Sequence, residues 1–170
     1  MFHAFDNAPP HRPMERTAWM ALLARAPEDL LRTALAAHAH SDVRWLRRPE
    51  TGLMMVQGRA GGTGERFNLG EVTVTRCALR LRAVDTADAP VGVAYVVGRN
   101  QRQARLAAVA DALLQQPAHQ ATLELNLLEP IRVHLQQEAA QRHARAQTTK
   151  VEFFTVAREA GAGNDEEDDA

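Results

Sequence analysis

The apolar residues near the start of the chain recur at the spacing of amphipathic helices. Residues 15–26 place an apolar stripe on one helical face and predict a first helix. Pro27 opens a second predicted helix that runs to about His38, because proline suits a first helical turn and the acidic residues after it suit the positive end of the helix dipole. We therefore expect a pair of N-terminal helices. The stripe of the first consists of Trp19, Leu22, Leu23 and Ala26.

Between residues 43 and 97 the pattern changes to the alternation that is typical of β-strands. Residues 43–47 and 52–59 predict two strands joined by a turn over residues 49–52. In residues 71–82 the apolar positions shift from even to odd numbers, so we expect a β-bulge near Thr75–Arg76. Residues 91–97 are apolar on both faces and predict a buried central strand.

Helical spacing returns after residue 100. Asn100 is the expected N-cap of a helix over residues 101–116, which Pro117 ends. A further helix over about residues 130–146 has an apolar stripe too thin to bury well by itself, so it either stands exposed or contacts another protein. Residues 151–156 have β-like composition and predict an edge strand or an arm that docks on a neighbour. We expect residues 130–158 to bind a partner.

Together these elements predict an α+β fold. It has a small antiparallel sheet of about four strands, with an N-terminal helix pair and C-terminal helices packed on it. A single domain over residues 14–158 is expected between a flexible arm, residues 1–13, and a disordered acidic tail, residues 159–170. The chain has no apolar run long enough for a membrane span and no signal peptide pattern, and its single cysteine fits a reducing compartment. These features predict a cytoplasmic protein.

The net charge of −1 conceals an uneven distribution. Five carboxylates lie in residues 165–169, and without them 20 basic residues face 16 acidic ones, a net charge of about +4. All basic residues except Lys150 are arginines, which bind phosphate or carboxylate through two parallel hydrogen bonds. A GC-rich genome that encodes arginine in place of lysine is an equally good explanation. Aromatic residues make up only 5% of the chain and no basic stripe is present, which argues against nucleic-acid binding.

The most distinctive stretch is glycine-rich and charged. Five of the ten glycines fall within residues 58–70, a stretch that also contains Arg59 and Arg66 and is followed by Arg76. Neither common phosphate-binding pattern is present, because no lysine follows the glycines and Phe67 stands where a third glycine would complete Gly-x-Gly-x-x-Gly. Glycine lets backbone N–H groups approach a ligand closely. The stretch therefore indicates an anion-binding hairpin or loop, with a hairpin required for shape alone as the alternative.

Other candidate sites are weaker. Gly98-Arg99-Asn100 lies at a predicted helix N-terminus, where an anion can bind, although ordinary capping by Asn100 explains the motif equally well. The seven histidines do not form a metal-binding pattern, so no metal site is expected. Cys77 alternates with leucines and is expected to be a core thiol. No Ser/His/Asp or Cys/His set indicates nucleophilic catalysis by this chain alone.

Residues 61–76, which read Gly-Gly-Thr-Gly-Glu-Arg-Phe-Asn-Leu-Gly-Glu-Val-Thr-Val-Thr-Arg, resemble the signature of the PhnG family, the G subunits of bacterial carbon–phosphorus lyase. The resemblance covers about residues 14–158 in unbroken order. Further matching segments are Glu50-Thr51-Gly52-Leu53, Gly98-Arg99-Asn100, Asp111-Ala112-Leu113-Leu114-Gln115-Gln116 and Val151-Glu152-Phe153-Phe154-Thr155.

The resemblance implies a subunit that assembles with the H, I and J subunits, and possibly the L subunit, and takes part in displacing adenine from MgATP by a phosphonate. The product would be an α-D-ribose 1-phosphonate 5-triphosphate. MgATP is then a substrate of the complex, and this chain is expected to bind no cofactor by itself. The I subunit is expected to carry the nucleosidase chemistry and J the radical step, in keeping with the lack of an iron–sulfur cysteine cluster here.

Within that reaction the expected roles of this chain are orientation and charge stabilisation. Four arginines are expected to contact the anion, three glycines to allow backbone approach, and Glu65 to order an arginine, with a catalytic role for Glu65 as a weaker alternative. A subunit that serves assembly alone, with no active-site residue, is the competing hypothesis. The expected anion-binding residues are Arg59, Arg66, Arg76 and Arg99, with Gly61, Gly62 and Gly64.

Overall fold

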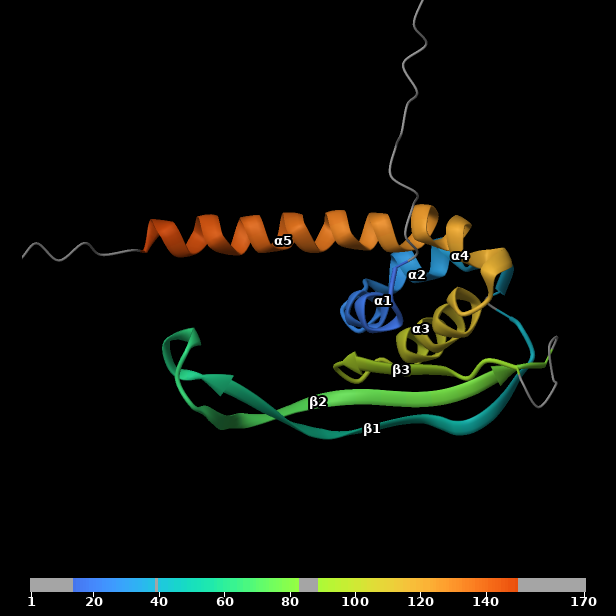
Figure 1. The fold of residues 1–170 in the computed structure, drawn as a ribbon, viewed down its shortest axis with the longest axis horizontal. Coiled ribbons are helices and arrows are strands. Elements are labelled where there is room, and N and C mark those ends of the chain that lie inside the picture. The colour runs from blue at the N-terminus through green and yellow to red at the C-terminus, as the bar shows by residue number, and fades with distance from the viewer. Residues whose placement is uncertain (1–13, 39, 83–88, 150–170) are drawn as a thin grey trace, which may run out of the picture.

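The fold is α+β, as predicted, with a three-stranded antiparallel sheet covered on one face by helices (Figure 1). A computed structural model describes residues 14–38, 40–82 and 89–149. The strands are β1 (Val43–Arg59), β2 (Arg66–Leu81) and β3 (Gly92–Val97), in the order β1-β2-β3. The helices are α1 (Arg16–Leu23), α2 (Glu28–Ala34), α3 (Gln101–Leu114), α4 (Pro117–Leu123) and α5 (Glu129–Thr148), and short helical segments are η1 (Ala36–His38), η2 (Ala60–Gly62) and η4 (Glu124–Leu128).

The sheet has three strands rather than about four because residues 43–59 form one long strand. The turn predicted over residues 49–52 is wrong. Instead, the β1–β2 register shifts between Trp45 and Arg47 and again between Arg47 and Glu50. Pro49 lies within the second irregularity, because it has no N–H to donate to a regular ladder. The irregularities are tolerated because β1 is an edge strand.

The bulge predicted near Thr75–Arg76 does not lie in β2, which pairs regularly with β3 there; the irregularity next to Arg76 puts the extra residue on β1, between Arg47 and Glu50. Side chains alternate between faces in a regular strand, so Thr75 and Cys77 face the helices while Val72 and Val74 lie on the opposite face. The shift from even to odd apolar positions thus marks two apolar faces. The irregularity of β2 falls closer to the hairpin end, opposite Val56 and Gln57.

The prediction of a central strand over residues 91–97 is wrong, because β3 is the second edge of the sheet and β2 lies between β1 and β3. One face of β3 is buried under α3, whereas Tyr95 and Val97 on the other face are exposed. Gly92 permits the close packing of α3. A Cβ atom at this position would lie 2.0 Å from the carbonyl oxygen of Ala108.

The core lies between this sheet face and the predicted helices, which all form. α3 supplies the largest share of it, with ten buried residues between Ala104 and Leu114, of which only Asp111 is polar. Asn100 caps α3 as predicted, because its side-chain oxygen accepts a hydrogen bond of 3.0 Å from the backbone N–H of Gln103. α1 and α2 add Trp19, Leu23 and Leu31 to the same core. α3 thus packs directly on the sheet, α1 contacts β3, and α2 packs on α3.

One buried carboxylate joins three elements of this core. Asp111 on α3 is fully buried and accepts hydrogen bonds from the indole N–H of Trp19 at 2.9 Å and the backbone N–H of Val93 at 2.9 Å. Arg16 donates to both carboxylate oxygens, at 3.2 and 2.7 Å, and this contact raises the pKa of the Arg16 guanidinium. The four hydrogen bonds link α1, α3 and β3 through one side chain.

The C-terminal helices leave the core. Three helical segments, α4, η4 and α5, follow one another directly. η4 is a π-helical turn, which is wider than an α-helical turn and lets the helix continue to Pro130, a residue with no N–H to donate. Ile131 of α5 is buried, but residues 136–149 are exposed on this chain, as the thin apolar stripe predicts. Figure 1 shows α5 extending past the helices that cover the sheet. Among the described residues, no helix combines the length and apolar character needed to cross a bilayer.

We expect Asp111→Ala to lower the free energy of unfolding by about 2–4 kcal/mol, because two buried N–H donors lose their acceptor. Urea unfolding followed by circular dichroism measures the change. The matched control is Asp42→Ala, which removes an exposed carboxylate 3.4 Å from Arg82 and should cost less than about 1 kcal/mol. Equal effects of the two substitutions would contradict a structural role for the buried network.

Cys77 generates a prediction about alkaline pH. Its thiol is 1% exposed, donates to the carbonyl oxygen of Ala104 at 3.2 Å, and burial raises its pKa from 9.0 to about 12. Above pH 9.0 the unfolded thiol ionises while the folded thiol does not, so this group lowers stability as the pH rises toward 12. Cys77→Ala should therefore lose less stability than the native chain between neutral and alkaline pH, measured by urea unfolding. Parallel pH profiles for the two chains would refute this.

Candidate functional site

The glycine-rich stretch forms the tip of a two-stranded arm. β1 and β2 continue past the helices as a hairpin, which we define as the arm, residues 53–72 (Figure 1). The helices leave the arm uncovered, and even its large apolar side chains are exposed, with Leu53 at 66% and Leu69 at 63%. A projecting hairpin of this kind presents its tip away from the core of its own chain.

Backbone geometry at the tip explains the glycines. Gly61 and Gly62 have φ of 58° and 80°, a left-handed region that residues with a Cβ atom rarely adopt. The backbone N–H of Gly64 donates to the carbonyl oxygen of Ala60 at 2.9 Å and closes the turn. Arg59 fixes the other side, because its Nη1 donates to the carbonyl oxygen of Gly64 at 3.1 Å. The tip is therefore a closed turn with one arginine folded across it.

A cleft of about 470 Å³ lies at this tip, and both of its charged lining residues are arginines. Arg59 and Arg66 are directly opposite each other in the β1–β2 register. Like charges in that position repel, and an anion between them would relieve the repulsion. Arg66 is exposed and makes no ion pair with any described residue. The lining residues are Gln57, Gly58, Arg59, Gly62 and Arg66.

The tip thus brings together six of the eight residues predicted for the site, although only Arg59, Gly62 and Arg66 line the cleft. Glu65 was expected to order an arginine, but it is exposed and makes no hydrogen bond or ion pair with any described residue. Arg59 is ordered instead by the carbonyl oxygen of Gly64. Sequence reasoning missed Gln57 and Gly58. The alternation of the strand before the glycines was the signal that could have identified them.

Arg76 lies elsewhere. It is ten residues from Arg66 along β2, roughly 30 Å at about 3.3 Å per residue. Its Nε donates to Glu50 at 2.7 Å, and Arg47 reaches the same carboxylate oxygen at 2.5 Å. Hydrogen bonds from Arg47 and then Arg76 lower the pKa of Glu50, which keeps this carboxylate ionised. The expectation that Arg59 and Arg76 reach one polyphosphate is therefore corrected, because ten residues of extended strand separate Arg76 from the tip and Arg76 is paired with Glu50.

Arg99 is also apart from the tip. The backbone N–H of Gly98 bonds the carbonyl of Thr73, seven residues or roughly 20 Å from Arg66 along β2. The helix N-terminus beside Arg99 already has a carboxylate, because Glu28 accepts a hydrogen bond of 2.6 Å from Asn100. Capping thus accounts for the geometry of this motif, and anion binding by Arg99 stays a prediction.

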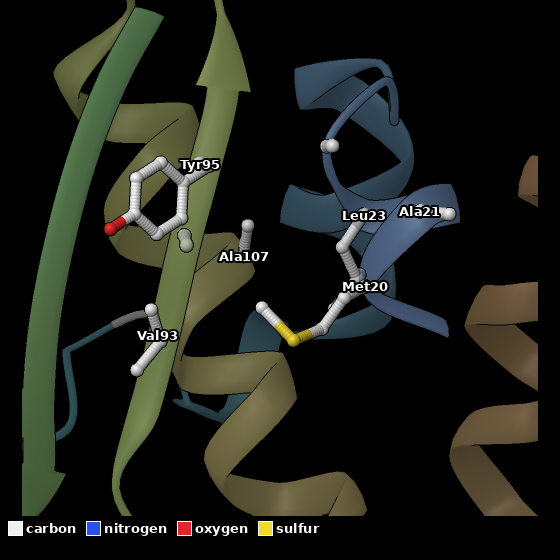
Figure 2. Close-up of a pocket in the computed structure, with 8 residues that line it drawn as sticks. Met20, Ala21, Leu23, Val93, Tyr95 and Ala107 are labelled. Atoms are coloured by element: carbon white, nitrogen blue, oxygen red, sulfur yellow. The ribbon is translucent and has the colours of Figure 1, made fainter. Parts of the chain in front are cut away.

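Two other hollows carry less chemistry. A pocket of about 230 Å³ between α1, β3 and α3 is lined almost wholly by apolar side chains (Figure 2). A second hollow of about 470 Å³ contains His38 and His119, whose rings meet edge to face at a centroid separation of 5.8 Å. Within the described ranges, no group of three or more His, Cys, Asp or Glu side chains is placed to hold a metal ion. The arm tip is the site whose residues match the predicted chemistry.

Comparison with known proteins agrees with the sequence signature. The family model described as phosphonate metabolism protein PhnG matches residues 14–159. A similar protein from Rhizobium meliloti (strain 1021) is named alpha-D-ribose 1-methylphosphonate 5-triphosphate synthase subunit PhnG. It is 41% identical over 145 residues, which cover 85% of this chain and 89% of the relative. The chain therefore belongs to the PhnG family of phosphonate metabolism proteins.

Proposed function

We propose that this chain is a non-autonomous subunit of a ribose 1-methylphosphonate 5-triphosphate synthase, in which a phosphonate displaces adenine from MgATP. The name of the R. meliloti relative supports the subunit role. The observation that carries the proposal for this chain is the arm tip, where Arg59 and Arg66 oppose each other across one cleft. In this proposal the arm places the two arginines against the triphosphate or the phosphonate, in an active site completed by a partner subunit.

The chemistry fits a contribution of charge and position. Displacement at the anomeric carbon joins two anionic reactants, so their mutual repulsion must be offset and their approach oriented. Guanidinium groups bind phosphate and phosphonate oxygens through paired hydrogen bonds. Gly62 adds a surface without a side chain beside them, which permits close backbone approach. The magnesium ion enters with ATP as part of the substrate. The H, I and J subunits are the proposed partners, and the L subunit a possible further one in transfer.

A second candidate function is assembly alone, and one observation favours it: the arm is exposed and apolar along much of its length, as interface elements are. In that case the tip would pack on a partner and its arginines would contact no substrate. The two functions differ in what happens to turnover when the tip is altered in an intact complex.

Arg66→Ala tests the proposal. In a complex that still assembles, loss of one charged contact to the transition state should slow adenine release by roughly 30- to 1000-fold, about 2–4 kcal/mol. Gly62→Val should be at least as damaging, because its side chain would enter the cleft and a β-branched residue is strained at φ of 80°. Turnover and co-purification are measured on the same preparations.

Arg32→Ala is the matched control for this test. It removes an arginine whose side chain is 56% exposed on α2 and bonded to Asp29, away from the tip, and should leave turnover unchanged. The isolated native chain should release no adenine. Full turnover by an assembled Arg66→Ala complex would instead support the assembly function.

We also propose that the exposed half of α5, residues 136–149, contacts a partner subunit. This stretch makes no contact that buries it on its own chain, and an isolated polar helix gains little stability without one. A chain ending at residue 135 should fail to co-purify with the H, I and J subunits, whereas a chain ending at residue 149 should assemble. Normal assembly of the shorter chain would disprove this contact. Residues 150–158, which the sequence also predicted to bind, lie outside the described residues.

A further inference from the structure

A β-bulge in the arm sets the chemistry of the cleft at its tip. Val56 pairs with Gly70 across the arm. The next residue of β1, Gln57, pairs with Asn68, so Leu69 is the extra residue of the bulge. Gly70 has a φ of 147°, which residues with a Cβ atom rarely adopt, and this glycine therefore lets β2 accommodate the extra residue. Bulges of this kind change which side chains meet beyond them, here toward the tip.

The bulge brings polar side chains together on one face of the tip. In the register that precedes the bulge, Arg59 would lie opposite Phe67, because each step along β1 is one step back along β2. With the bulge, Arg59 lies opposite Arg66 instead, and Gln57 lies opposite Asn68. Residues 57 and 59 are two apart on β1, so both pairs lie on the same face. That face thus carries two guanidinium groups and two amides.

The apolar side chains of this segment lie on the other face. Phe67 pairs with Gly58, one residue away from each of the polar pairs. The side chain of Leu69 covers Gly58, where a Cβ atom would be 2.6 Å from Leu69 Cδ1. The missing side chain of Gly58 leaves this space to Leu69, and the contact supports the bulge. Polar and apolar residues are therefore separated at the tip by the bulge.

The amide of Gln57 is held in place beside the two arginines. Its Nε2 donates a hydrogen bond of 3.2 Å to Oδ1 of Asn68. Gln57 makes no other side-chain hydrogen bond with a described residue, so its second amide hydrogen is available to a ligand. Gln57 lines the cleft, whereas Asn68 does not. Asn68 therefore acts on a bound ligand through the orientation of Gln57.

Two guanidinium groups and one amide suit a tetrahedral PO₃ group. Such a group presents three oxygens, and the donors around the cleft come from three different side chains. Arg59 uses one N–H on the carbonyl oxygen of Gly64, which leaves the rest of its guanidinium for a ligand. A neutral amide adds a hydrogen bond to the anion without adding to the repulsion between Arg59 and Arg66.

We propose that Gln57 is a third anion-binding side chain of the tip and that Asn68 is a positioning residue, which orients the Gln57 amide. The group they bind is a PO₃ group, either the phosphonate or the terminal phosphate of ATP, held between Arg59 and Arg66. This inference rests on the proposed function of the tip and adds to it the class of group that binds there.

Adenine release by the assembled complex tests the two roles, with methylphosphonate and ATP varied separately. Gln57→Ala should lower kcat/KM by about 10-fold or more, because a hydrogen bond to a charged group is lost. Asn68→Ala should lower it by about 2- to 10-fold, as loss of a neutral hydrogen bond does. A rise in the KM for methylphosphonate would identify the phosphonate as the bound group, and a rise in the KM for ATP the terminal phosphate.

The double variant separates a positioning role from a general one. If Asn68 acts through Gln57, adding Asn68→Ala to Gln57→Ala should cause no further loss of kcat/KM. Losses that multiply in the double variant would overturn the positioning role. Asn126→Ala is the matched control, because it removes an exposed asparagine from η4, outside the sheet, and should leave kcat/KM unchanged.

Arg66→Ala, measured in parallel, distinguishes this inference from the proposed function. If Arg66→Ala slows adenine release and Gln57→Ala does not, the tip binds its anion without Gln57, so this inference is overturned while the proposed function stands. If neither substitution slows release, both are overturned. Gln57 and Asn68 are exposed, so both variants should fold and co-purify with the partner subunits. Loss of co-purification would show that the amide pair is an interface contact and would overturn this inference as well.

Discussion

The buried carboxylate of Asp111 is the interaction on which the rest of the fold depends. A carboxylate with no solvent access is stable only when its oxygens are fully hydrogen-bonded. Here Arg16 and Trp19 of α1 donate three hydrogen bonds, and the backbone N–H of Val93 in β3 donates the fourth. Those bonds set the angle at which α1 approaches α3 and hold the edge strand β3 under both. Gly92 completes the arrangement, because only the absence of a side chain allows the α3 backbone to come so close. The core is thus assembled at one end of a sheet whose other end it does not reach.

This one-sided packing has a consequence for the long hairpin. The helices cover one face of the sheet near β3 and leave both the arm and the outer face without cover from the described elements (Figure 1). A hairpin that gains no burial from its own core is stabilised mainly by its ladder, so its exposed leucine, methionine and phenylalanine side chains are explained better by binding than by folding. The exposed half of α5, residues 136–149, likewise gains no burial from the core. Both features suit a subunit that completes its structure in a complex, as the PhnG family membership indicates.

The proposed roles follow from where the arginines lie. Arg59 and Arg66 face each other across the cleft at the tip, where we propose that a substrate anion binds, and Arg47 and Arg76 lie farther along the sheet, where they share Glu50. Arginine is the most frequent basic residue throughout, so its abundance alone distinguishes neither role. The distinction comes from the partners already present. Arg47 and Arg76 are paired with Glu50 on the sheet, whereas Arg59 is bonded to the carbonyl oxygen of Gly64 in the closed glycine turn.

The sequence by itself determined the N-terminal helix pair, α3 and α5, the antiparallel α+β class, the Asn100 cap and a glycine-rich turn, because spacing, capping and turn chemistry act between residues close in the chain. It did not determine that residues 43–59 form one strand, that β3 is an edge, or that Arg76 and Arg99 lie far from the tip. It also gave no role to Asp111, although a single acid among the apolar residues of the helix over 101–116 was a usable signal. These features were decided by the tertiary structure, because strand order and burial arise from contacts between residues as distant as Arg16 and Asp111, which no local pattern encodes.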